Sequence, residues 1–154
     1  MCLDCFFRCF KTSDLSKKFR AELDLMYWGA KNARLVRKYF QRRLFYIYNC
    51  EISHNAQIHP SVLFGHPTGV VIGSNVVVGA DCRIYQQVTQ GANLTSNNEM
   101  SSIGKGFIVG AGAKIIGPVT IGEHCLIGAN AVVTKNVPSY SVVGGANKYL
   151  GPRK

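Results

Sequence analysis

An aliphatic residue recurs at every sixth position through most of the last hundred residues, and this repeat constrains the fold more than any other feature. The phase holds without a slip from Ile103 to Val133, and the next residue is often glycine. The fifth residue of each unit is small or apolar. The repeated aliphatic positions are Ile52, Ile58, Ile72, Val78, Ile84, Ile103, Val109, Ile115, Ile121, Ile127 and Val133.

Neither the 3.6-residue period of a helix nor the two-residue period of an ordinary strand produces this spacing. A short strand followed by a sharp turn does. The aliphatic side chain then points inward, and the glycine is expected in a backbone conformation that most residues avoid. Three units would close one triangular coil of about 18 residues, and stacked coils would bury a continuous aliphatic column. The repeat therefore predicts a mainly β protein, a parallel β-helix.

The repeat is interrupted twice. Between Phe64 and Ile72 the step is eight residues, and between Gln90 and Ile103 it is thirteen. The first interruption contains the sequence Gly-His-Pro-Thr-Gly at 65–69, and the second, 91–102, is polar. Loops that leave a rigid scaffold commonly carry binding and catalytic residues. Both interruptions are therefore predicted to contribute to a functional site.

The composition changes near residue 50. Residues 1–50 contain 11 of the 18 Lys and Arg residues but only one of the 16 glycines, Gly29. We therefore divide the chain into a basic, aromatic helical arm over 1–50, a β-helix over 51–138 and a C-terminal extension over 139–154.

Two helices are predicted within residues 14–48 from the spacing of apolar residues. Asp14 would cap the first helix and Gly29 would end it, and Asn32 would cap the second. One side of the second helix is predicted to be apolar and the other basic. The predicted apolar residues are Leu35, Val36, Tyr39, Phe40, Leu44 and Ile47.

The basic and aromatic face of the arm has two interpretations: packing within an oligomer, or contact with a membrane surface. Nucleic acid is not an expected partner. The sequence shows neither an apolar run of the ~20 residues that a membrane span needs nor a secretory signal, so we expect a cytoplasmic protein or one at the inner face of the membrane. The six cysteines are then expected to stay reduced. A metal cluster or lipidation at Cys2, Cys5 and Cys9 is the less favoured alternative.

Four segments resemble the hexapeptide-repeat acyltransferases, in their serine acetyltransferase-like branch. They are Gly65–Gly73, Gln87–Gly91, Gly110–Gly117 and Ile127–Pro138. The resemblance implies a left-handed parallel β-helix, a homotrimer with sites between its subunits, and transfer of an acetyl group from acetyl-CoA to an acceptor hydroxyl.

The resemblance assigns the catalytic base to His66. A hydroxyl attacks a thioester poorly unless a base takes its proton, and histidine, with an ordinary pKa of ~6.5, can accept that proton and return it to the leaving thiolate. Glu51 occupies the place of the family's dyad aspartate and is expected to orient the imidazole.

The same resemblance predicts where acetyl-CoA lies. Gly91, Ala92 and Asn93 are expected near the thioester, with the Ala92 amide as a candidate oxyanion donor. Ala111 and Ala129 are expected along the pantetheine arm. Lys135 is expected to meet a CoA phosphate.

The acceptor loop departs from true serine acetyltransferases. Their Arg-His pair is absent from the stretch that includes Glu99 and Met100, and Gly65 replaces the aspartate before the histidine. In the family, an acidic residue of the helical region before the prism helps to hold the acceptor. Asp24 is a candidate for that role. We therefore expect a neutral acceptor, a sugar hydroxyl of a surface or capsular polysaccharide or its precursor. The alternatives are a serine O-acetyltransferase and a non-catalytic trimeric scaffold.

His54 and His59 also resemble part of the zinc site of gamma-class carbonic anhydrases. That site takes a third histidine from well upstream, and no histidine precedes His54 here. No metal is therefore expected.

Overall fold

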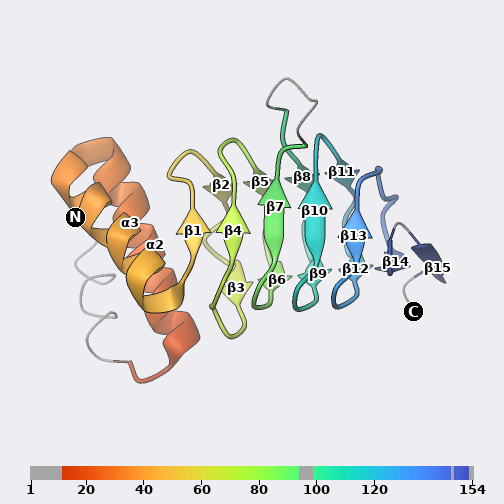
Figure 1. Ribbon diagram of the computed structural model, residues 1–154, viewed down its shortest axis with the longest axis horizontal. Helices are drawn as coiled ribbons and strands as arrows, with labels where there is room; N and C mark the ends of the chain where they lie inside the picture. The colour runs from red at the N-terminus through yellow and green to blue at the C-terminus, as the bar shows by residue number, and fades with distance from the viewer. Residues whose placement is uncertain (1–11, 94–98, 147, 153–154) are drawn as a thin grey trace.

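The computed structural model describes residues 12–93, 99–146 and 148–152. Two helices, α2 (Leu15–Asn32) and α3 (Arg34–Tyr48), pack side by side at one end of a stack of short strands. Figure 1 shows the helices against the first coil and the strands advancing away from them, so the C-terminal strands lie at the far end of the molecule.

The strands form three sheets, one for each face of a prism. The first sheet has the order β1-β4-β7-β10-β13, the second β11-β8-β5-β2, and the third β15-β14-β12-β9-β6-β3. Every pairing between these strands is parallel except that of β14 with β15. The strands are β1 (Glu51–Ile52), β2 (Gln57–Ile58), β3 (Leu63–Phe64), β4 (Val71–Ile72), β5 (Val77–Val78), β6 (Arg83–Ile84), β7 (Thr89–Gly91), β8 (Ser102–Ile103), β9 (Ile108–Val109), β10 (Lys114–Ile116), β11 (Thr120–Ile121), β12 (Leu126–Ile127), β13 (Val132–Val133), β14 (Ser141–Gly144) and β15 (Lys148–Pro152).

The inward column of aliphatic residues is confirmed. Each predicted position is buried, and successive coils place these residues directly over one another, as in the register of Ile52 on Ile72. Burying aliphatic surface in this way contributes roughly 25 cal/mol per Å² and is the main driving force for the prism. Gln90 is the polar exception in the column, between Ile72 and Ile115.

The expected role of the repeated glycines is wrong. Those that follow the inward aliphatic residues, such as Gly79 and Gly104, do not have the positive φ predicted for them. They are small because successive coils approach closely: a Cβ at Gly79 would lie 2.8 Å from the carbonyl carbon of Gly104, and one at Gly104 would lie 2.8 Å from the amide nitrogen of Glu123. The left-handed conformation occurs two residues later in the unit, for example at Asn75 and Asp81.

The arm buries its first helix against the first coil. Asp14 caps α2 as predicted, because its carboxylate accepts hydrogen bonds from the amides of Ser16 and Lys17. The ring of Phe19 then packs edge-on against Phe64 of β3, with ring centroids 5.0 Å apart. The helix and the prism therefore share one hydrophobic core.

The predicted helix boundaries need two corrections. Gly29 does not end α2, and it is glycine because a Cβ there would lie 2.5 Å from the backbone nitrogen of Arg37 in α3. Asn32 does not cap α3. Its side chain instead donates a hydrogen bond to the carbonyl oxygen of Trp28, and Ala33 precedes α3 without a side-chain cap.

The predicted apolar side of α3 is only partly correct. Leu44 is buried and Phe40 packs on the core, but Leu35, Tyr39 and Ile47 are exposed in the single chain. Arg43, on a different side of α3, faces α2, where it binds a buried carboxylate. Sequence spacing alone could not reveal that partner.

That carboxylate belongs to Glu22, which is 1% exposed. Its two oxygens accept hydrogen bonds from Arg43, at 3.1 Å from Nε and 2.8 Å from Nη2. The hydrogen bond to Glu22 raises the pKa of Arg43, so the arginine stays charged. A two-pronged pair of this kind fixes the two helices in one orientation.

Cys50, Cys82 and Cys125 are buried free thiols, and burial raises the pKa of Cys50 and of Cys82. Cys82 and Cys125 occupy the predicted inward positions of the repeat. Cys2, Cys5 and Cys9 lie outside the described residues. Within the described part of the chain, neither helix is long and apolar enough to cross a membrane.

Candidate active site

His66 stands at the corner between β3 and β4, where the repeat is first interrupted. Its backbone is left-handed, with φ of 53°, and its side chain is exposed. Two hydrogen bonds fix the loop: the amide of Gly69 donates to the carbonyl of Tyr48, and that of Gln87 donates to the carbonyl of Thr68. The histidine therefore projects from a corner that the arm and the second coil both hold in place.

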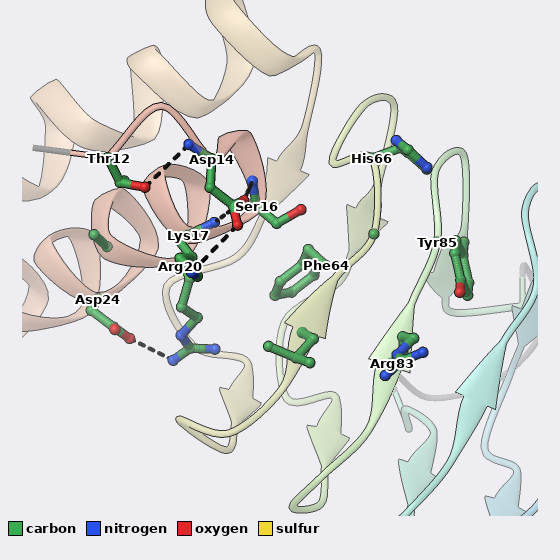
Figure 2. Close-up of a pocket in the computed structure, with 13 residues that line it drawn as sticks. Thr12, Asp14, Ser16, Lys17, Arg20, Asp24, Phe64, His66, Arg83 and Tyr85 are labelled. Atoms are coloured by element: carbon green, nitrogen blue, oxygen red, sulfur yellow. Dashed lines mark hydrogen bonds and ion pairs between the residues drawn. The ribbon is translucent and has the colours of Figure 1, made fainter. Parts of the chain in front are cut away.

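A cavity of about 800 Å³ lies beside His66, between α2 and the first two coils. Figure 2 shows that α2 contributes one wall, with Arg20 and Asp24, and that the prism contributes the other, with Phe64, Arg83 and Tyr85. The full lining is Thr12, Asp14, Ser16, Lys17, Arg20, Ala21, Asp24, Leu63, Phe64, Gly65, His66, Arg83 and Tyr85.

The helix wall holds two ion pairs. Asp14 lies 3.7 Å from Lys17, and Asp24 lies 2.5 Å from a guanidinium nitrogen of Arg20. Asp24, the candidate acceptor contact, is thus brought into the same cavity as His66. Because both signs of charge face this space, it can receive a ligand that itself carries both.

Gly65 is a glycine because of the aromatic ring beside it. A Cβ at Gly65 would lie 2.9 Å from two ring carbons of Tyr85. Tyr85 therefore occupies the space that a side chain at position 65 would need. A larger residue at position 65 would require the Tyr85 ring to move.

Glu51, the expected partner of His66, lies at the start of β1. It is exposed and lines a second, smaller cavity of about 420 Å³ together with Lys38 and Arg42 of α3. Glu51 and His66 both lie within the described part of the chain, and no hydrogen bond joins their side chains there. The pairing of Glu51 with His66 stays a prediction.

The residues expected to hold acetyl-CoA fall in two places. Ala111 and Ala129 stack on one edge of the prism, where the amide of Asn130 donates to the carbonyl of Ala111. This edge also carries the His66 corner, since the hydrogen bonds of Thr68 with Gln87 and of Gln86 with Gly112 continue the same stack.

Gly91 ends β7 on the other side of the first sheet, with Ala92 and Asn93 directly after it. The Asn93 side chain lies against Gly117 of the next coil. Lys135 is exposed just after β13. These residues and the alanine edge flank one face of the prism.

The second interruption is described only at its ends, because residues 94–98 lie outside the described range. Glu99 is exposed. Met100 is half-buried and packs on the core, with its methyl group against Gly73. In the single chain, neither of these two residues lines the cavity beside His66.

The cavity residues that sequence reasoning missed include Arg20, Arg83 and Tyr85. The repeat contained a signal for two of them, since Arg83 is the cross-strand partner of Leu63 and so lies one coil from the His66 corner. Nothing comparable existed for Arg20, because the docking of α2 on the prism depends on tertiary packing.

His54 and His59 have protein neighbours of their own. His54 lies 3.4 Å from a guanidinium nitrogen of Arg37, and His59 contacts the hydroxyl of Ser61 at 2.8 Å. Across the described residues, no group of three His, Cys, Asp or Glu side chains is arranged to hold a metal.

Family models match both halves of the repeat. Residues 100–135 match the bacterial transferase hexapeptide (six repeats), and residues 65–93 match the hexapeptide repeat of succinyl-transferase. The serine acetyltransferase of Mycobacterium tuberculosis is 46% identical over 95 residues, which are 57% of this chain and 42% of that protein. The serine acetyltransferase of Haemophilus influenzae is 33% identical over 120 residues, 77% of this chain and 45% of that protein.

Solved structures agree with these relatives. Serine acetyltransferase from Brucella abortus in complex with coenzyme A superposes with a TM-score of 0.83 at 29% identity, covering 90% of this chain and 57% of that one. A serine acetyltransferase in complex with cysteine gives a TM-score of 0.80 at 28% identity, covering 90% and 55%. Superposition preserves handedness, so the left hand that the resemblance implied is confirmed. The chain spans less than half the length of the two curated relatives above.

The expectation of a polysaccharide hydroxyl as acceptor is wrong, because these relatives and structures are serine acetyltransferases. That expectation assumed that charged contacts to an acceptor had to come from the positions at which the family carries them. The fold instead brings charged residues of α2 and β6 to the cavity beside His66. On sequence and structure together, this chain belongs to the hexapeptide-repeat acyltransferases, in their serine acetyltransferase-like branch.

Proposed function

We propose that this chain is a serine O-acetyltransferase that uses acetyl-CoA as the acetyl donor. The observation that carries the proposal is the position of His66, exposed at an interruption of the prism and beside a cavity that presents both signs of charge. A free amino acid carries an ammonium and a carboxylate, and it needs partners of both signs when it leaves water. The relatives with similar sequence and fold, which are serine acetyltransferases, support serine as the acceptor.

His66 acts as the general base. As the serine hydroxyl oxygen attacks the thioester carbonyl carbon, the imidazole accepts the hydroxyl proton. The tetrahedral intermediate then collapses, the carbon–sulfur bond breaks, and the departing thiolate takes the proton from the imidazolium. The products are O-acetylserine and CoA, and the histidine returns to its starting state.

Glu51 is proposed to orient the imidazole as a positioning residue. Its carboxylate would fix the ring tautomer and stabilise the imidazolium, as in other base–carboxylate pairs. Glu51 lies next to the end of the histidine loop, because its amide donates to the carbonyl of Val70. Its replacement by glutamine should lower the maximal rate and change the pH profile.

Acetyl-CoA is proposed to lie along the prism face between the alanine edge and the end of β7. Small residues suit this position, because among the described residues a Cβ at Gly91 would meet only the Thr89 methyl group, at 3.9 Å, which leaves room for a ligand beside that part of the backbone. The structure of a relative in complex with coenzyme A supports a CoA site on this fold. Ala111 and Ala129 would contact the pantetheine arm, and Lys135 a phosphate.

The assembly is proposed to be a homotrimer. Leu35 and Tyr46 of α3 are 81% and 79% exposed in the single chain, and large exposed apolar side chains on one helix often mark an interaction surface. We infer that neighbouring subunits cover this face of α3. Light scattering after gel filtration tests the trimer. Flotation with anionic vesicles tests the competing membrane contact, and co-flotation of the trimer would overturn the inference about α3.

The central experiment compares the protein with a His66→Asn variant. Asparagine tolerates the left-handed backbone at this corner, so the loop should keep its conformation. We expect CoA thiol release with acetyl-CoA and L-serine to fall by about 10²- to 10⁴-fold, the usual contribution of a general base. Acetyl-CoA affinity should change little. An unchanged turnover would overturn the role of His66, and absence of serine-dependent thiol release by the unmodified protein would overturn the proposed function.

A further inference from the structure

Arg83 is a cation of the cavity beside His66 whose charge is not used within the described structure. Lys17 lies 3.7 Å from Asp14, and Arg20 lies 2.5 Å from Asp24. Arg20 also donates to the carbonyl oxygen of His59. Arg83, by contrast, has neither a hydrogen bond nor a salt bridge to any described residue.

The position of Arg83 keeps its guanidinium at the prism wall of the cavity. It begins β6, and its cross-strand partner is Leu63 of β3. Figure 2 shows Arg83 and Tyr85 on the same wall, across from Asp14 and Arg20 of the helix wall. Tyr85 in turn packs against Gly65, the residue before His66. Arg83 is therefore connected to the histidine corner through Tyr85, two residues further along the chain.

The surroundings of Arg83 leave its guanidinium accessible to a ligand. Arg83 is exposed in the single chain and Leu63 beside it is 54% exposed, so an incoming carboxylate can reach the guanidinium without displacing a described protein partner. Arginine also offers parallel N–H groups that match the two oxygens of a carboxylate.

The size of the cavity adds a second argument. Its volume of about 800 Å³ is far larger than a molecule of serine, so the shape of the cavity does not by itself select or orient so small an acceptor. A charged anchor at a fixed position can do both. Among the Lys and Arg residues that line this cavity, Arg83 can bind a carboxylate without giving up an ion pair to a described residue, because Lys17 and Arg20 already have acidic partners.

We propose that Arg83 binds the α-carboxylate of the amino acid acceptor. The proposal rests on the proposed function and assigns to Arg83 the contact that the missing Arg-His pair would otherwise make. Bound there, the carboxylate lies on the prism wall, and the acceptor hydroxyl extends toward His66. Arg83 is a binding residue and takes no part in proton transfer.

The test compares two acceptors with the unmodified chain and its variants. L-serinamide keeps the ammonium and the hydroxyl of serine but lacks the carboxylate. For Arg83→Gln we expect the KM for L-serine to rise by about 10- to 100-fold, because a charge-assisted hydrogen bond is lost, with kcat within a few-fold of the unmodified value. The KM for L-serinamide should stay the same. For Arg83→Lys we expect a KM for L-serine between that of the unmodified protein and that of Arg83→Gln. Lysine keeps the positive charge but lacks the parallel N–H donors of arginine.

Arg34→Gln is the matched control, because Arg34 is an exposed arginine of α3 that lines neither cavity. It should leave both KM values unchanged. Thermal melting and acetyl-CoA binding of each variant report whether it is folded.

The outcomes separate the two proposals. If the unmodified protein acetylates serine and Arg83→Gln leaves the KM for serine unchanged, or raises the KM for both acceptors equally, the role of Arg83 is overturned and the function stands. If the unmodified protein acetylates neither acceptor, both proposals fail.

Discussion

The helical arm and the prism are stabilised in different ways. In the arm, a buried carboxylate and a guanidinium hold α2 against α3, and Phe19, Leu23 and Met26 of α2 join the hydrophobic core of the prism. In the prism, the same aliphatic contact and the same close backbone approach recur coil after coil. A repeated structure distributes its stability over many similar contacts, whereas the arm depends on a few specific ones. The proposed acceptor cavity lies where the two regions meet.

Breaking the ion pair of the arm should have the largest effect. Arg43→Met leaves the carboxylate of Glu22 buried without its cation, and removing one partner of a buried pair costs about 3–5 kcal/mol. We expect a loss of that order in the free energy of unfolding, measured by urea denaturation followed by circular dichroism.

The double variant Glu22→Gln/Arg43→Met is the control for this prediction. It removes the orphaned charge and should recover part of the loss. If the single and double variants were equally unstable, the loss would come from the packing of Arg43 and the ion pair would not be the element that holds the arm.

A smaller effect is expected from interference with one coil contact. Gly79→Ala places a methyl group 2.8 Å from the backbone of Gly104, which overpacks the stack and should cost about 1–3 kcal/mol. Gly128→Ala is a matched control at the same position of the repeat, where the nearest atom to the new Cβ is 3.4 Å away. We expect a clear drop in Tm for the first variant and a small one for the second, and equal drops would contradict the close-approach explanation.

The smallest effect should be a gain. Neither amide atom of Gln90 has a hydrogen-bond partner among the described residues, although the residue is fully buried in the aliphatic column. Gln90→Leu removes an unsatisfied polar group and should stabilise the prism by about 1–2 kcal/mol. Gln57→Leu, at an exposed position of β2, should change Tm little. Destabilisation by Gln90→Leu would show that the amide has a role that the present packing does not explain.

The prism was predictable because its period is a local property. The spacing of Ile103, Val109 and Ile115 fixes which side chains share a face, and short parallel strands then have one register that keeps them buried. The two interruptions were equally visible, and the first marked His66. The glycines were located correctly but explained wrongly, because their spacing does not distinguish a left-handed corner from a close approach between coils.

The arm was less predictable. The Asp14 cap follows from sequence alone, since its interaction is with amides two and three residues away. The inward face of α3 does not follow from sequence alone. It depends on the pairing of Arg43 with Glu22, which lies twenty-one residues away in the chain. A hydrophobic pattern gives no information about a buried ion pair.

The sequence by itself determined the β-helix, its inward column and the histidine corner, because each depends on residues close together in the chain or on a fixed period. Only the tertiary structure decided how the arm meets the prism, that Tyr85 packs against Gly65, and that Arg83 shares a cavity with His66. These features join residues through the docking of α2 on the first coils. That docking is set by packing and charge between distant segments, which a periodic pattern does not encode.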